Sequence, residues 1–172
     1  MTIYEKRTKT AGAEETNLRL LLENIKKMQI IHETGSTCCA DSKEWKNCAY
    51  GWHNPLFPPE YRACCLKGEH FTANPSCDLY YFMACYYETI TGRKAPYNFE
   101  LDHIWKERLF TCFTESGSVH GTAVSHIIAN CTRWKKRKRI QSAGELLKTE
   151  DIRALTDTLE RAKKLNLENT SV

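Results

Sequence analysis

Residues 99–105 read FELDHIW, and residues 121–139 read GTAVSHIIANCTRWKKRKR. The first stretch is short and strand-like, and it predicts a strand from Tyr97 to Ile104 that ends at an Asp–His pair. The second stretch predicts a helix from Thr122 to Arg137, because Val124, Ile127, Ile128 and Cys131 fall on one face. A strand that leads into a helix predicts an α+β fold.

Candidate catalytic residues lie within these two stretches. Asp102 and His103 stand side by side at the predicted strand end, where an acid and an imidazole can hold a divalent cation and a general base close together. His126 follows 23 residues after His103, and Asn130 comes one helical turn later. These residue types suit metal binding and proton transfer.

The third feature is a cationic run that follows directly. It contains six cations, which are Arg133, Lys135, Lys136, Arg137, Lys138 and Arg139. Without those six, the formal net charge of +4 becomes −2, so the basic character is one local patch on a mildly acidic chain. Such a patch predicts binding to a polyanion, nucleic acid above all, and the alternatives are a solvated helix face or a targeting signal.

Together these features resemble the HNH, or ββα-metal, endonucleases over residues 85–139. The resemblance implies a small ββα-metal-like core in which His103 is the general base. Asp102, His126 and Asn130 would bind Mg²⁺, Mn²⁺ or Zn²⁺. The implied activity is metal-dependent hydrolysis of phosphodiester bonds, with DNA favoured over RNA as the substrate.

Nine cysteines and no visible signal peptide predict reduced thiols in an intracellular compartment, cytoplasmic or, in a eukaryotic host, nuclear. Most lie in a Cys/His-rich, loop-rich region, residues 37–84, which also carries four of the five prolines. A structural zinc site there would use Cys48, His53, Cys64 and His70. Metal-free buried thiols and redox-active cysteines are the alternatives.

Amphipathic helices are predicted at both ends of the chain. An arm (Met1–Glu14) precedes a helix capped by Thr16 within residues 1–36, and Thr149 caps a second helix in the tail, residues 140–172. The apolar stripes of these helices are candidates for a homodimer contact. Between them, residues 78–91 form a buried helix or strand, and no apolar run is long enough for a membrane span.

The function predicted first is therefore a metal-dependent endonuclease. The alternative is a non-enzymatic, cysteine-rich regulator that binds zinc and nucleic acid, of the type encoded by viruses or mobile elements. A third interpretation is a helical adaptor in which the cationic run is an import signal. The three differ in whether Asp102, His103 and His126 converge on a metal.

Overall fold

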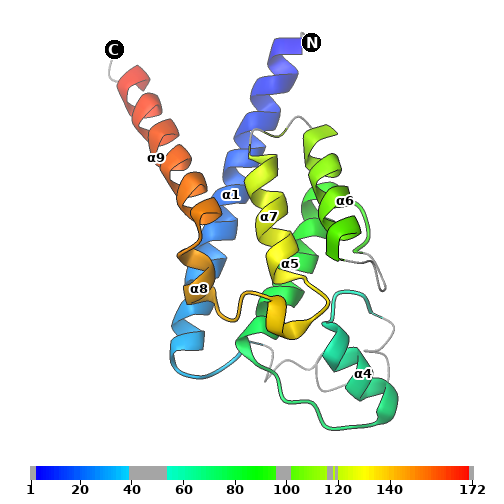
Figure 1. Cartoon of the computed structure of the whole chain (residues 1–172). Helices are drawn as coiled ribbons and strands as arrows, with labels where there is room; N and C mark the ends of the chain where they lie inside the picture. Colours follow the sequence, from blue (N-terminus) through cyan, green and yellow to red (C-terminus); the bar gives the residue numbers. More distant parts are fainter. Residues whose placement is uncertain (1–2, 39–53, 96–101, 116–117, 119, 171–172) are drawn as a thin grey trace.

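The computed structural model describes residues 3–38, 54–95, 102–115, 118 and 120–170, and every regular element in those ranges is a helix (Figure 1). The helices are α1 (Ile3–Glu33), α4 (Pro59–Lys67), α5 (Pro75–Thr91), α6 (Asp102–Glu115), α7 (Gly121–Cys131), the 3-10 helix η1 (Lys136–Lys138), α8 (Ala143–Leu147) and α9 (Glu150–Thr170). The predicted α+β class, with its ββα-metal-like core, is therefore wrong. The described part of the chain has an all-α fold.

The stretch predicted to be a strand shows why the fold class was wrong. Helix α6 begins at Asp102, while residues 97–101 lie outside the described residues. Trp105, Leu109 and Phe113 are buried, so apolar side chains recur every four residues and share one helix face. The FELDHIW stretch ends at Trp105, where this pattern starts, and so short a run cannot distinguish a helical period from a strand period.

Helix α1 carries the predicted apolar stripe but begins earlier than predicted. Leu18, Leu21 and Ile25 are buried, as the sequence indicated. The predicted cap, Thr16, is instead an internal helix residue whose hydroxyl donates to the carbonyl of Gly12 at 2.9 Å. The residues after Ile3 that were predicted to be an arm continue the same helix.

Helix α7 packs against α5, α6 and α9, and lies among them in Figure 1. Its apolar sequence explains this position, since Ile127 and Ile128 are buried. At its start, Gly121 allows α6 to approach closely, because a Cβ there would lie 2.8 Å from the Cβ of Phe113. Residues 78–91, for which the sequence allowed either a helix or a strand, belong to helix α5. Gly92 is the C-cap of this helix and has a φ of 65°.

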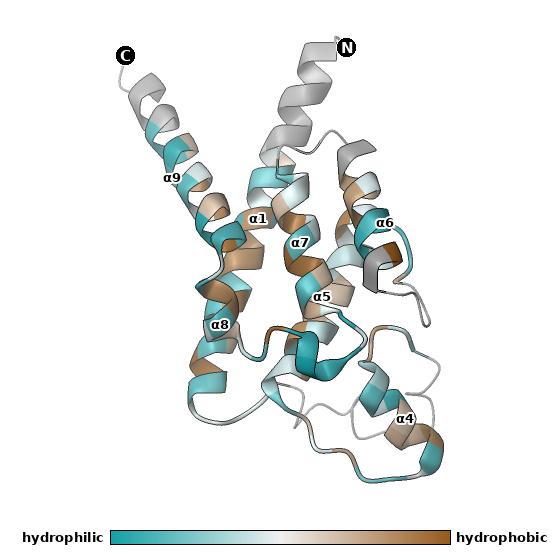
Figure 2. Ribbon diagram, viewed as in Figure 1, coloured by the Kyte–Doolittle hydropathy of each residue, from teal (hydrophilic) through white to brown (hydrophobic). Residues whose placement is uncertain are grey.

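Helices α8 and α9 both pack against α1. The hydroxyl of Thr149 accepts a hydrogen bond from the N–H of Ile152 at 3.4 Å, which confirms Thr149 as the predicted cap of the tail helix. Ile152, Leu155 and Leu159 are buried, so the predicted stripe faces the protein. Figure 2 shows hydrophobic residues on the part of α1 that lies beside α8.

Helix α4 belongs to a smaller apolar cluster in the region predicted to be loop-rich. Phe57, Tyr61 and Cys77 are buried there, and the rings of Phe57 and Tyr61 lie 4.8 Å apart between centroids. Pro59 begins the helix, and Gly68 ends it with a φ of 68°. In the described ranges, no helix is both long and apolar enough to cross a lipid bilayer.

Candidate nucleic-acid interface

The cationic run begins after helix α7 has ended. Thr132 is the C-cap of α7: its hydroxyl donates to the carbonyl of Ile128 at 2.7 Å and accepts the indole N–H of Trp105 at 2.6 Å. The predicted continuation of this helix to Arg137 is therefore wrong. The chain turns instead through η1, and we call residues 133–138 the basic loop.

The basic loop presents most of its charge to solvent. Four successive side chains are exposed, namely Lys135, Lys136, Arg137 and Lys138. Arg133 is half-buried, and its guanidinium donates to the side-chain carbonyl of Asn130 at 2.8 Å. Five of the six predicted cations thus lie at or near the surface.

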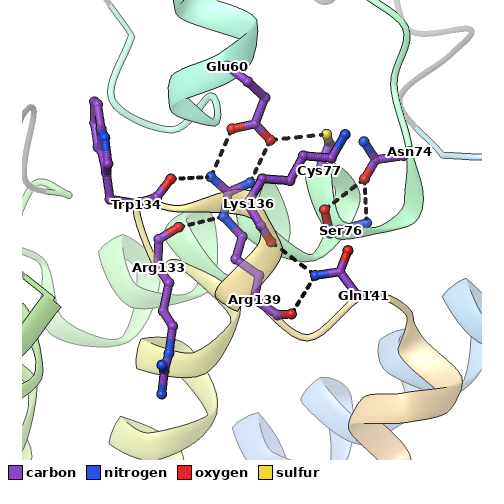
Figure 3. Close-up of polar contacts among 9 residues, drawn as sticks. All are labelled: Glu60, Asn74, Ser76, Cys77, Arg133, Trp134, Lys136, Arg139 and Gln141. Atoms are coloured by element: carbon purple, nitrogen blue, oxygen red, sulfur yellow. Dashed lines mark hydrogen bonds and ion pairs between the residues drawn. The ribbon is translucent and has the colours of Figure 1, made fainter.

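Arg139 differs from its neighbours because its side chain is completely buried, with an exposed fraction of 0%. Its guanidinium donates to both carboxylate oxygens of Glu60 on α4, at 2.6 and 2.8 Å (Figure 3). The same guanidinium lies over the ring of Tyr80, 4.8 Å from its centroid. A planar guanidinium suits this two-point contact and the stacking, whereas an ammonium group does not. Arg139, which the sequence predicted to bind phosphate, therefore joins α4 to the basic loop.

Arg139 and Gln141 also hold the backbone of the basic loop. Arg139 donates to the carbonyls of Arg133 and Trp134, at 2.5 and 3.1 Å (Figure 3). The side-chain amide of Gln141 donates to the carbonyl of Lys136 at 3.0 Å and to that of Arg139. The carbonyls of Arg133, Trp134 and Lys136 therefore have defined partners, which hold the backbone that carries the exposed cations.

Sequence reasoning missed Glu60 and Gln141. Glu60 precedes Arg139 by 79 residues and lies in the segment interpreted as a Cys/His-rich region. No spacing rule connects positions so far apart. The one available signal was local, since an acidic residue directly after Pro59 suits the first turn of a helix.

The residues predicted for catalysis lie on two different helices. Asp102 and His103 occupy the first turn of α6, and their side chains lie outside what the structure describes. His126, on α7, has its Nδ1 3.4 Å from the carboxylate of Asp151 on α9. Asn130 instead accepts a hydrogen bond from the basic loop. The two predicted ligands on α7 therefore have different partners, and His126 belongs to no group of three or more His, Cys, Asp or Glu ligand atoms among the described residues.

Only two of the four predicted zinc ligands lie within the described residues, so the predicted site stays a prediction. Cys48 and His53 lie outside the described residues. Cys64 is half-buried near the end of α4, and His70 is exposed after that helix. Neither residue belongs to a group of potential metal ligands among the donor atoms that the structure describes.

A different group has the right residue types for a metal. The ligand atoms of His32, Cys38 and Asp78 all lie within 4.8 Å of one another. His32 Nε2 is 3.0 Å from Asp78 Oδ2, and the backbone N–H of Cys38 donates to the same oxygen at 2.6 Å. The side chains of His32 and Asp78 are almost fully buried. Sequence reasoning missed this group because it assigned His32 and Asp78 only to apolar segments.

The hydrogen bond at the other ring nitrogen of His32 indicates whether this group suits a metal ion. The backbone N–H of Ala143, the first residue of α8, donates to His32 Nδ1 at 3.1 Å. Because Nδ1 accepts, a neutral ring carries its proton on Nε2, which then donates to Asp78. A histidine that binds metal through Nε2 usually donates from Nδ1, and here Nδ1 faces a donor. The arrangement is thus a hydrogen-bonded link between α1, α5 and α8.

Three cysteines have thiol pKa values well above the ordinary value. Burial, and next the carboxylate of Glu60, raise the pKa of Cys77 to about 12. Burial, and then Asp78, raise the pKa of Cys38 to about 11, and burial raises that of Cys131 still further. These three thiols are therefore neutral at physiological pH. Cys131 acts as a small buried apolar group, whereas the thiol of Cys77 donates to the carboxylate of Glu60 at 3.6 Å.

No protein-family model matches this chain. Comparisons with curated proteins and with solved structures likewise found no match. The resemblance to HNH endonucleases stays a prediction, and functional inference rests on the geometry of the basic loop.

Proposed function

We propose that this chain is a nucleic-acid-binding protein that holds phosphates with the basic loop. The observation that carries the proposal is four successive exposed cations, from Lys135 to Lys138, on a backbone fixed by Arg139 and Gln141. Cations placed in this way neutralise neighbouring phosphates and release their counterions, which is the main source of sequence-independent affinity. This is the nucleic-acid-binding part of the regulator that the sequence suggested as an alternative.

The fixed backbone favours this function over a targeting signal. A peptide that is recognised in an extended groove must have its own backbone groups available to the receptor. In the basic loop, the carbonyls of Arg133, Trp134 and Lys136 are already bonded to Arg139 and Gln141. A receptor that binds an extended peptide would also require the 3-10 turn at Lys136–Lys138 to open, whereas phosphates need only the exposed side chains.

Endonuclease activity stays a separate prediction. The all-α fold removes the ββα-metal-like scaffold that would have positioned Asp102 and His126 around one metal ion. A direct assay is incubation of the protein with DNA and RNA in the presence of Mg²⁺, Mn²⁺ or Zn²⁺. Cleavage that disappears in His103→Ala, while affinity stays unchanged, would support a nuclease; binding without cleavage would support the proposal.

Salt-dependent binding tests the proposed function. Replacing Lys135, Lys136, Arg137 and Lys138 with alanine should reduce the slope of log K against log salt by about 3 to 4 for duplex DNA. The matched control removes four exposed lysines from α1 and α9, namely Lys26, Lys27, Lys163 and Lys164. An equal reduction in both variants, or no reduction in the first, would contradict the proposal.

A further inference from the structure

Helix α1 carries three exposed apolar side chains on the side away from its buried stripe. Leu20, Ile30 and Ile31 have exposed fractions of 51%, 67% and 36%. They project away from the side of the helix that buries Leu18 and Ile25 in the core. The stripe that suggested a dimer contact from the sequence is thus used inside the protein, and a different face of α1 remains exposed.

The exposed side of α1 has the spacing of a coiled-coil seam. Leu20, Asn24, Lys27 and Ile31 are separated by four, three and four residues, which is the alternation along such a seam. Glu23 and Lys27 are exposed, and the side-chain amide of Asn24 donates to the carbonyl of Leu20 at 2.8 Å. We call these five residues the outer face of α1. An apolar residue stands at each end of it, with the charged residues between.

We propose that α1 pairs through its outer face with α1 of a second copy of this chain, in antiparallel orientation. A two-fold axis near the middle of the face would place Leu20 against the partner's Ile31 at both ends of the contact. Each end would then bury one leucine and one isoleucine side chain that are exposed in the single chain. This inference does not rest on the proposed function.

The charges of the outer face favour a second copy as the occupant and select its orientation. Glu23 and Lys27 are one helical turn apart, on the same flank of the seam. In the antiparallel pair, Glu23 lies beside the partner's Lys27, and the two-fold axis repeats this ion pair. A parallel pair would instead place like charges side by side. The outer face is therefore self-complementary, as a contact between two identical surfaces must be.

Sedimentation velocity of the full chain tests the inference, with a reducing agent present to exclude disulfide-linked dimers. A contact of one helix from each copy is small, so the dimer should be weak and reversible. The wild-type protein should shift from monomer to dimer over about 1–300 µM. The salt-slope assay, whose control variant removes Lys27, is run far below this range and so measures the monomer.

Apolar substitutions test where the contact lies. The double variant Leu20→Asn, Ile31→Asn should stay monomeric over the whole range of concentrations. Leu66→Asn is the matched control, because Leu66 is an apolar residue on α4 with an exposed fraction of 68%. This control should dimerise like the wild type. All the substituted side chains are at least partly exposed, and circular dichroism checks that each variant is folded.

Charge reversal tests the orientation. Glu23→Lys alone should weaken the dimer by about 10-fold, because it replaces two attractions with two repulsions. The double variant Glu23→Lys, Lys27→Glu exchanges the charges and should restore wild-type dimerisation. General stickiness of the helix would not produce this reversal.

Three outcomes would overturn the inference. The first is a wild-type protein that stays monomeric at every concentration, a result that needs no variant to fold. The second is dimerisation that is unchanged in the Leu20→Asn, Ile31→Asn variant. The third is a folded charge-exchange variant that dimerises no better than Glu23→Lys, which would exclude the antiparallel pair. None of these results would affect the proposed function, because the basic loop lies outside the outer face.

Discussion

Replacing Arg139 with alanine should destabilise the fold, unlike replacement of the exposed cations beside it. The substitution removes a buried guanidinium that donates to both oxygens of Glu60 and to two backbone carbonyls. Removing one partner of a buried ion pair costs about 3–5 kcal/mol, because the other charge is left without compensation. Glu60 has an exposed side-chain fraction of 23%, so water can partly replace the lost partner. The expected cost is therefore near the lower limit, at about 3 kcal/mol.

Urea unfolding followed by circular dichroism measures this difference in the free energy of unfolding. In a chain of this length, about 3 kcal/mol corresponds to a decrease of roughly 6–12 °C in Tm. Lys138→Ala is the matched control, since Lys138 is exposed next to Arg139 and its loss should change stability by less than about 0.5 kcal/mol. A double-mutant cycle with Glu60→Ala should give a coupling free energy of about 2 kcal/mol.

The opposite pattern would refute the structural role of Arg139. A residue that contacts phosphate should reduce the salt slope by about 1 when it is removed and leave Tm unchanged. If Arg139→Ala unfolds like the wild type and binds nucleic acid with a reduced slope, the contact with Glu60 does not form. In that case the sequence-based prediction for this residue was the better one.

Three further predictions concern other sites. Gly121→Ala should lower the free energy of unfolding by about 1–3 kcal/mol, because the added methyl group would lie 2.8 Å from the Cβ of Phe113. Gly12→Ala is the control: its methyl group would meet nothing within 4 Å, and it should stabilise helix α1 slightly. His32→Ala should lower the free energy of unfolding by about 2 kcal/mol and speed hydrogen exchange of the Ala143 amide, with His32→Gln as the polar control. Loss of bound zinc without these effects would instead indicate that His32 binds a metal. Stability should fall as pH rises from 9.0 towards about 12, because Cys77 ionises near 9.0 when unfolded but keeps its proton in the native state. Iodoacetamide mapping should accordingly label Cys77 slowly at pH 8, and rapid labelling without unfolding would contradict its burial.

The sequence predicted long amphipathic elements well because their period repeats several times. The stripe of α1 and the cap and stripe of α9 were correct in the described residues, since each rests on several turns of consistent spacing. The strand prediction failed at Asp102, where a single turn of pattern was visible.

Only part of the candidate site could be predicted from the sequence. The run of cations is visible in the sequence, and the structure places Lys135–Lys138 at the surface, while their binding to nucleic acid stays a prediction. The role of Arg139 depends on Glu60, and that of His32 on Asp78 and Ala143. Such contacts arise only when distant helices pack, and neither local propensity nor motif spacing contains that information.

The ion pair between Glu60 and Arg139 also constrains how this chain can diverge. Because the Arg139 side chain is fully buried and joined to Glu60 at two points, a change of either partner alone should cost stability. Under the proposed function, the exposed residues Lys135–Lys138 need only positive charge, so lysine and arginine should replace each other there. An alignment of relatives should therefore show that Glu60 and Arg139 change together. The four exposed cations between Trp134 and Arg139 should be substituted independently of one another.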